Sequence, residues 1–152
     1  MNNRYLSRSF SIGIVFLAGV SCVFLACGKT EETISPEQKV VRYLTGQGNR
    51  FWQLKEMYVN GTRVSLTMAQ QSYNKTYTTY AGNTQYSGLF GDSDGNDGRW
   101  GLKGADHIMD TITNSTSGLV IFDLTINSID AYTMDVQYTK NSQTVRSVYS
   151  GN

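Results

Sequence analysis

The pattern of hydrophobic and polar positions divides the chain into three parts. Residues 10–25 are almost uniformly apolar or small, and residues 35–46 carry a short apolar stripe at helical spacing. From Arg50 onward, short runs alternate apolar and polar residues, which is the pattern of β-strands with one buried face. The order is therefore an apolar N-terminal segment, one helix and a long β region.

The predicted helix begins at a capping box. Ser35 can accept a hydrogen bond from the backbone of Gln38, whose side chain can reach back, and Pro36 suits the first helical position. The apolar stripe runs from Val40 to Leu44, and Gly46 ends the helix. A stripe this short buries little area, so we expect the helix to plug one end of the β structure.

Turn signals divide the β region into short strands. Asn60-Gly61 is the strongest of them, since both residues accept the positive φ of a two-residue hairpin. The most apolar strand places Val120, Phe122, Leu124 and Ile126 on one face. The predicted strands are Phe51–Val59, Thr62–Ala69, Tyr73–Tyr80, Thr84–Phe90, Arg99–Lys103, His107–Ile112, Leu119–Ile126, Tyr132–Tyr138 and Thr144–Tyr149.

Short connections favour pairing between strands that follow one another, which gives an antiparallel meander. Eight strands closed on themselves remove both sheet edges and leave an interior for side chains or one small ligand. The sequence therefore predicts an all-β fold, an antiparallel up-and-down meander barrel of eight or nine strands with one short N-terminal helix. Fifteen glycines and a single proline agree with many short turns.

The N-terminal segment has the pattern of a secretory signal, because Arg4 and Arg8 precede an apolar stretch shorter than the ~20 residues of a membrane span. Phe24-Leu25-Ala26-Cys27 resembles the lipobox of bacterial lipoproteins, which implies cleavage before Cys27 and a lipid on its thiol. Cys22 is the competing site. We expect a signal peptide over 1–26, a lipidated tether over 27–34 and one barrel domain over 35–152, with its leading helix at 35–46.

The lipobox resemblance implies an outer-membrane lipoprotein, because Gly28 does not match the aspartate that retains such proteins at the inner membrane. The acidic tether (Lys29–Glu32) is either a surface-export tag or a solvated linker, which leaves the periplasmic and the surface side open. The formal net charge of +1 and the lack of a basic run exclude nucleic acid as a partner. We expect a monomer whose barrel folds without disulfides.

A second resemblance covers Arg50 to Tyr149. Phe51-Trp52-Gln53-Leu54, Asn60-Gly61, Asp94-Gly95 and the segment Gly98–Leu102 resemble the lipocalin-like domain of small Gram-negative lipoproteins. The resemblance implies a barrel with a structural tryptophan in its first strand. Such a barrel can be open, with aromatic residues lining a ligand pocket, or filled, with the same residues forming the core. The aromatic residues concerned are Trp52, Tyr58, Phe90, Trp100 and Phe122.

The candidate chemistry is sparse. Asp92, Asp94 and Asn96 alternate at the spacing of a calcium loop, but the glycine and glutamate that complete that motif are missing, so we expect a hairpin turn and no metal. His107 is the single histidine, and no nucleophile stands in a recognisable elbow. We therefore expect no cofactor and no enzymatic activity.

The sequence favours a non-catalytic, lipid-anchored binding module of the cell envelope that takes a small apolar or amphipathic molecule or a sugar. The alternative is a structural or interaction lipoprotein, or an extracellular inhibitor or immunity-type protein, that docks on another envelope protein through a filled barrel. A cavity of a few hundred Å³ lined by aromatic residues would favour the ligand, and a solid core with an exposed apolar patch would favour the protein partner.

The lipid anchor gives the first testable prediction. Replacing Cys27 with serine removes the thiol that accepts the lipid, so labelled fatty acid should no longer be incorporated and the protein should leave the membrane fraction. Cys22→Ser is the matched control and should label as the unaltered protein does. Loss of label in the control, with label retained in Cys27→Ser, would move the anchor to Cys22.

Overall fold

The computed structural model describes residues 34–79, 86–113, 116 and 118–152, all of which belong to one compact unit. The predicted signal peptide, Cys27 and the tether up to residue 33 lie outside the described residues. The contacts described below are all made within this compact unit.

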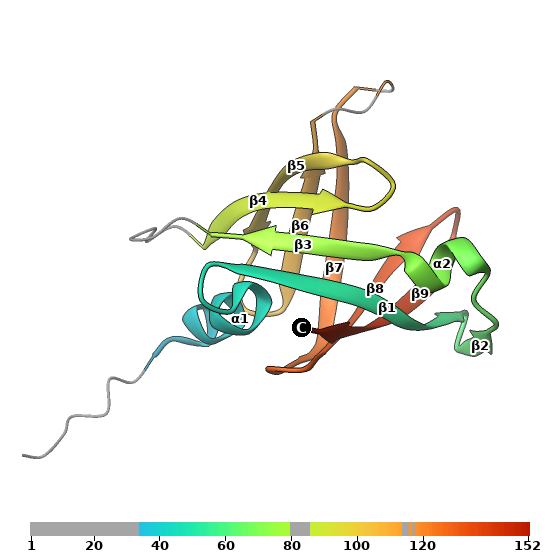
Figure 1. Cartoon of the computed structure of the whole chain (residues 1–152), viewed down its shortest axis with the longest axis horizontal. Helices are drawn as coiled ribbons and strands as arrows, with labels where there is room; N and C mark the ends of the chain where they lie inside the picture. The colour runs from blue at the N-terminus through green and yellow to red at the C-terminus, as the bar shows by residue number, and fades with distance from the viewer. Residues whose placement is uncertain (1–33, 80–85, 114–115, 117) are drawn as a thin grey trace, which may run out of the picture. The chain divides into compact units, whose positions relative to one another are not determined.

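The described strands form a closed antiparallel barrel (Figure 1). Each barrel strand pairs with the next along the chain, and β1 pairs with β9 to close the sheet, while β2 extends one edge of β1. The predicted up-and-down meander is therefore confirmed. Its strands are β1 (Asn49–Val59), β2 (Thr62–Val64), β3 (Asn74–Thr78), β4 (Ser87–Asp92), β5 (Asp97–Leu102), β6 (His107–Ile112), β7 (Val120–Ile129), β8 (Thr133–Lys140) and β9 (Gln143–Gly151).

The helix α1 (Pro36–Thr45) covers one end of the barrel, where it contacts β1, β3 and β7. The capping box forms as predicted: the Ser35 hydroxyl accepts from the backbone of Gln38, and the Gln38 side chain accepts from the backbone of Ser35. Leu44 is fully buried, and its carbonyl accepts a hydrogen bond of 2.8 Å from the Trp52 indole. The helix and the first strand are thus joined where the barrel is plugged.

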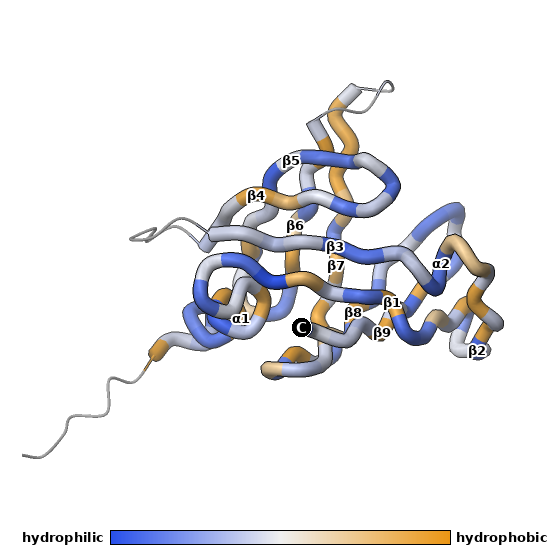
Figure 2. The backbone as a smooth tube through the Cα atoms, viewed as in Figure 1, coloured by the Kyte–Doolittle hydropathy of each residue, from blue (hydrophilic) through white to orange (hydrophobic). Residues whose placement is uncertain are grey.

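Large side chains fill the half of the interior next to α1. Trp52 and Trp100 are 0% and 1% exposed, as predicted, and hydrophobic and hydrophilic residues alternate along the strands (Figure 2). Glycines make room for both rings, since Gly151 pairs with Trp52 and Gly88 pairs with Trp100. A Cβ atom at Gly88 would lie 2.7 Å from Trp100 Nε1, which leaves no space for a side chain there.

The predicted strand Thr62–Ala69 is wrong beyond Val64. The chain leaves β2 and forms the short helix α2 (Met68–Ser72), which begins at a second capping box between Thr67 and Gln70. Apolar alternation predicted a strand, but the local hydrogen bonds of the capping box favour a helical turn. Met68, which the strand would have buried, is 84% exposed.

The prediction that Tyr58 lies inside the barrel, in a pocket or in the core, is also wrong. A register shift between Leu54 and Glu56 places an extra residue in the strand, and a bulge of this kind reverses which residues face inward. Tyr58 therefore lies on the outer surface, where the guanidinium carbon of Arg146 stacks 4.8 Å from its ring centroid.

The predicted strand Tyr132–Tyr138 begins one residue later than predicted, because Tyr132 lies in the turn before β8 and is 77% exposed. The Asp130 side chain shapes this turn by accepting hydrogen bonds from the backbone N–H groups of Tyr132 and Thr133. Met134 and Val136, which follow at strand spacing, are buried.

The buried tryptophans give a prediction of stability. Trp52→Ala or Trp100→Ala in the fragment 28–152 should lower the free energy of unfolding by about 3–5 kcal/mol, the usual cost of truncating a large core aromatic. Urea unfolding followed by circular dichroism measures this loss. Tyr132→Ala, at an exposed aromatic, is the matched control and should stay within about 0.5 kcal/mol of the unaltered fragment. Losses below about 1 kcal/mol for both tryptophans would contradict a structural role.

Candidate functional site

The end of the barrel opposite α1 holds a cavity of about 310 Å³. The residues that surround it come from β1, α2, β3, β4, β6, β7, β8 and β9 and from the turn between β4 and β5. Its apolar wall consists of Leu54, Met57, Phe90, Ile112, Phe122 and Leu124, and its polar lining includes Tyr73, Lys75, Tyr138, Ser147 and Tyr149. The barrel interior is therefore filled at one end and hollow at the other.

An aromatic pair forms part of the cavity wall between β7 and β8. The rings of Phe122 and Tyr138 pack edge to face with centroids 6.0 Å apart. The ladder between these strands runs from the Thr125–Gln137 pair to the Ile129–Met134 pair, so the two rings lie beyond its end. At this part of the wall, β7 and β8 are joined by the packing of these two side chains and not by backbone hydrogen bonds.

A buried polar cluster separates the cavity from the packed core. Lys75 Nζ donates to Asp110 Oδ2 at 2.8 Å, and the Tyr77 hydroxyl donates to the same oxygen at 2.8 Å. The Lys75 side chain is 9% exposed and lines the cavity, while that of Asp110 is 0% exposed. Asp110 Oδ1 has no hydrogen-bond partner among the described residues.

Burial and charge fix the protonation states around this cluster. Burial alone would lower the pKa of Lys75, but the Asp110 carboxylate, together with smaller contributions from Tyr149 and Tyr138, outweighs it, so the pKa is raised and the ammonium stays charged. Burial raises the pKa of Tyr149 and of Tyr138, in spite of the nearby Lys75 charge. Their hydroxyls therefore keep their protons and can donate hydrogen bonds.

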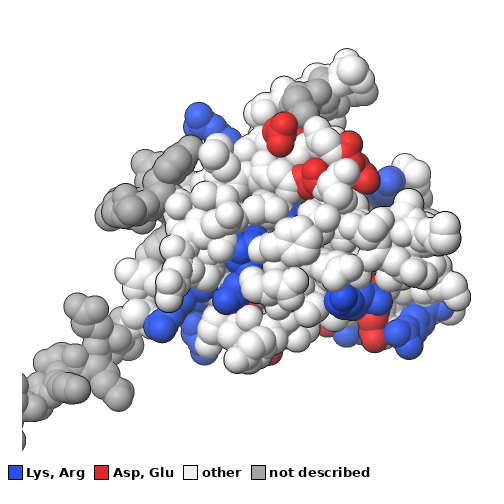
Figure 3. All heavy atoms as spheres, viewed as in Figure 1, with Lys and Arg blue, Asp and Glu red and all other residues white. Residues whose placement is uncertain are grey.

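The acidic loop at the cavity mouth is a hairpin turn between β4 and β5, as expected. Asp92 Oδ1 accepts from the backbone N–H groups of Asp94 and Asn96 at 3.0 Å, and the Asn96 side-chain amide donates to both carboxylate oxygens of Asp92. The Tyr73 hydroxyl also donates to Asp92 Oδ2. Acidic side chains gather over this hairpin (Figure 3).

The five aromatic candidates separate into three groups. Phe90 and Phe122 line the cavity, Trp52 and Trp100 belong to the packed core, and Tyr58 lies outside the barrel. Phe90 belongs to the core as well, at its boundary with the cavity. The polar half of the lining was not among the candidates predicted from the sequence. Lys75 and Tyr77 alternate along β3, and Tyr73 precedes them at the same spacing, so the pattern that places Tyr77 inside also places Lys75 there. That alternation was the available signal.

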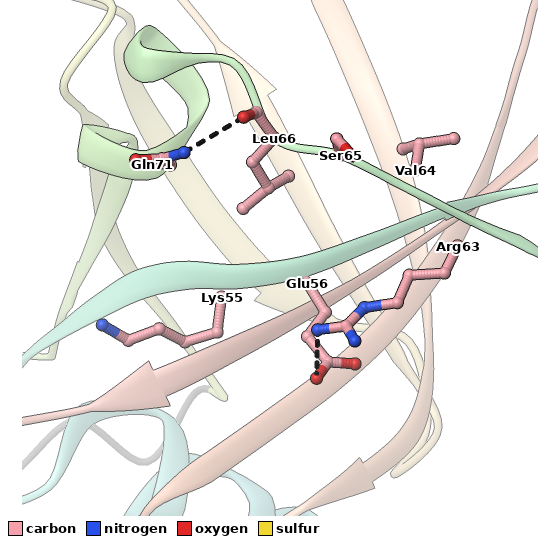
Figure 4. Close-up of a pocket in the computed structure, with 7 residues that line it drawn as sticks. All are labelled: Lys55, Glu56, Arg63, Val64, Ser65, Leu66 and Gln71. Atoms are coloured by element: carbon pink, nitrogen blue, oxygen red, sulfur yellow. Dashed lines mark hydrogen bonds and ion pairs between the residues drawn. The ribbon is translucent and has the colours of Figure 1, made fainter.

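The outer surface carries a polar groove and a contact between a histidine and an aspartate, and neither has the apolar wall of the cavity. A shallow polar groove lies beside β1, β2 and α2 (Figure 4), where Arg63 pairs with Glu56 at 3.0 Å and is itself largely exposed. Exposed ion pairs of this kind contribute little to the free energy of folding. His107 Nδ1 lies 2.5 Å from Asp123 Oδ1 on the outer face of β6 and β7.

Comparison with protein-family models, curated proteins and solved structures found no significant match for this chain. The lipocalin resemblance therefore stays a prediction. Among the described residues, no helix is both long and apolar enough to cross a membrane.

The loop geometry predicts the response to calcium. Because Asp92 Oδ1 already accepts from backbone and amide donors, millimolar calcium should leave the melting temperature of the fragment 28–152 unchanged. A native-state site with a micromolar Kd would add about 4 kcal/mol at a thousandfold excess of the ion, which thermal unfolding detects easily. A rise of several degrees that disappears in Asp94→Ala would restore the calcium interpretation.

Proposed function

We propose that this chain is a non-catalytic, lipid-anchored binding module of the bacterial cell envelope, and that it binds a small amphipathic molecule in the open end of its barrel. The observation that carries this proposal is the cavity between the filled core and the barrel mouth. A volume of about 310 Å³ lies at the lower limit of small-molecule sites. We therefore expect a small ligand.

The lining supports an amphipathic ligand. One part of the wall is aliphatic and aromatic, including Leu54, Phe90 and Phe122, while Lys75 and Tyr149 present polar groups to the same space. Sites for small molecules combine a mainly apolar wall with a few placed polar groups. A ligand with one apolar part and one polar part matches such a wall better than a wholly apolar one.

The state of Lys75 supports a binding role rather than catalysis. A lysine that acts as a nucleophile has a lowered pKa and is neutral when it reacts. Here the pKa is raised by the Asp110 carboxylate, and the ammonium is held in an ion pair. The alternative of a protein that docks on a partner through a filled barrel requires a solid interior, and the cavity counts against it.

Binding can be tested with N-phenyl-1-naphthylamine, an uncharged apolar dye that fluoresces when it leaves water. The fragment 28–152 should enhance its fluorescence in a saturable way. Ser147→Phe places a ring in the cavity and should abolish the enhancement, because Ser147 lines that space and is 3% exposed. Ser150→Phe, on the other face of β9, is the matched control and should bind the dye normally.

Two results would contradict the proposal. The first is no saturable enhancement by a fragment that is folded by circular dichroism. The second is equal enhancement by the Ser147→Phe and Ser150→Phe variants, which would place the dye on the outer surface.

A further inference from the structure

We propose that Lys75 is the head-group site of the cavity and that it selects ligands carrying a carboxylate on an apolar chain. This inference rests on the proposed binding function and adds to it a chemical class of ligand and an orientation. The carboxylate would lie against the Lys75 ammonium at the cavity floor, and the apolar chain would extend along the aromatic wall toward the mouth.

The position of the Lys75 ammonium supports this inference. Lys75 lines the cavity, whereas Asp110 does not and its side chain is fully buried. Asp92, Asp94 and Lys140 also line the cavity, but Asp92 Oδ1 already accepts hydrogen bonds from the backbone N–H groups of Asp94 and Asn96. A group that reaches the floor therefore meets the Lys75 cation before it meets Asp110, the anion that balances it. Because the interaction of two charges falls with distance, a bound anion gains more from Lys75 than it loses to Asp110.

The Lys75 ammonium also has unused hydrogen-bonding capacity among the described residues. An ammonium group has three N–H donors. Among the described residues, Asp110 Oδ2 is the one acceptor within hydrogen-bond distance of Lys75 Nζ, which also lies 5.1 Å from the centroid of the Phe90 ring. Donor capacity thus remains for a ligand oxygen.

The buried ion pair between Lys75 and Asp110 is not explained by the stability of the fold. A buried ion pair replaced by apolar residues of similar size often leaves a protein equally stable or more stable. Folding alone therefore gives little reason to place a lysine and an aspartate in the middle of this barrel. An ammonium that faces a cavity can instead serve to bind a ligand, because charge-assisted hydrogen bonds are stronger and more selective than neutral ones.

The neighbouring hydroxyls fit the same ligand. Tyr138, Ser147 and Tyr149 line the cavity, and both tyrosines lie close enough to Lys75 to interact electrostatically with it. Burial keeps these tyrosines protonated, so they can donate to an anionic oxygen. The remaining wall, with Phe90, Phe122 and Leu124, offers an apolar surface for a chain.

The test compares octanoate with octan-1-ol, which carry the same chain length but a different head group. Each displaces N-phenyl-1-naphthylamine from the fragment 28–152, and the competition gives both affinities. Octanoate should bind at least about tenfold more tightly than octan-1-ol, the effect of one charge-assisted hydrogen bond.

Two variants identify the residue responsible. Lys75→Met with Asp110→Asn removes both charges, leaves no unpaired buried ion and should make octanoate and octan-1-ol compete with the dye equally well. Lys75→Arg keeps the cation and should retain the preference. Equal affinity for octanoate and octan-1-ol in the unaltered fragment, or an unchanged preference in the double variant, would overturn this inference. Failure of the unaltered fragment to bind the dye at all would instead overturn the proposed function.

Discussion

The ion pair between Lys75 and Asp110 lies where the two halves of the barrel interior meet, and the arrangement of the interior depends on it. On one side, Asp110 accepts from Tyr77, whose ring packs against Trp100 and Phe90 in the core. On the other side, the Lys75 ammonium reaches the cavity. Burying either charge alone would cost several kcal/mol, so each residue requires its partner.

Closure of the sheet makes this interior possible. The pairing of β1 with β9 removes both edges of the barrel meander, and α1 closes one end through Leu44 and its contact with Trp52. The two tryptophans take up the space near that end because Gly151 and Gly88 lie opposite them. No comparable plug is present among the described residues at the other end, where the cavity opens.

The sequence predicted the features that depend on local pattern. The barrel order, the capped helix and the buried tryptophans follow from alternation, turn residues and the Ser35 capping box. It failed where two signals conflict: the capping box at Thr67 and Gln70 ends the alternation of β2, and the bulge after Leu54 turns Tyr58 outward. The cavity floor needs a contact between β3 and β6, 35 residues apart, which no local pattern predicts.

We propose that the open half of the barrel is a ligand site with Lys75 at its floor. The decisive measurement is a crystal structure of the fragment 28–152 grown with octanoate. We expect electron density for the octanoate chain between Phe90, Phe122 and Tyr138, with the carboxylate within hydrogen-bond distance of Lys75 Nζ. A barrel in which Tyr73, Phe122 and Tyr138 fill the space and no octanoate is bound would contradict it.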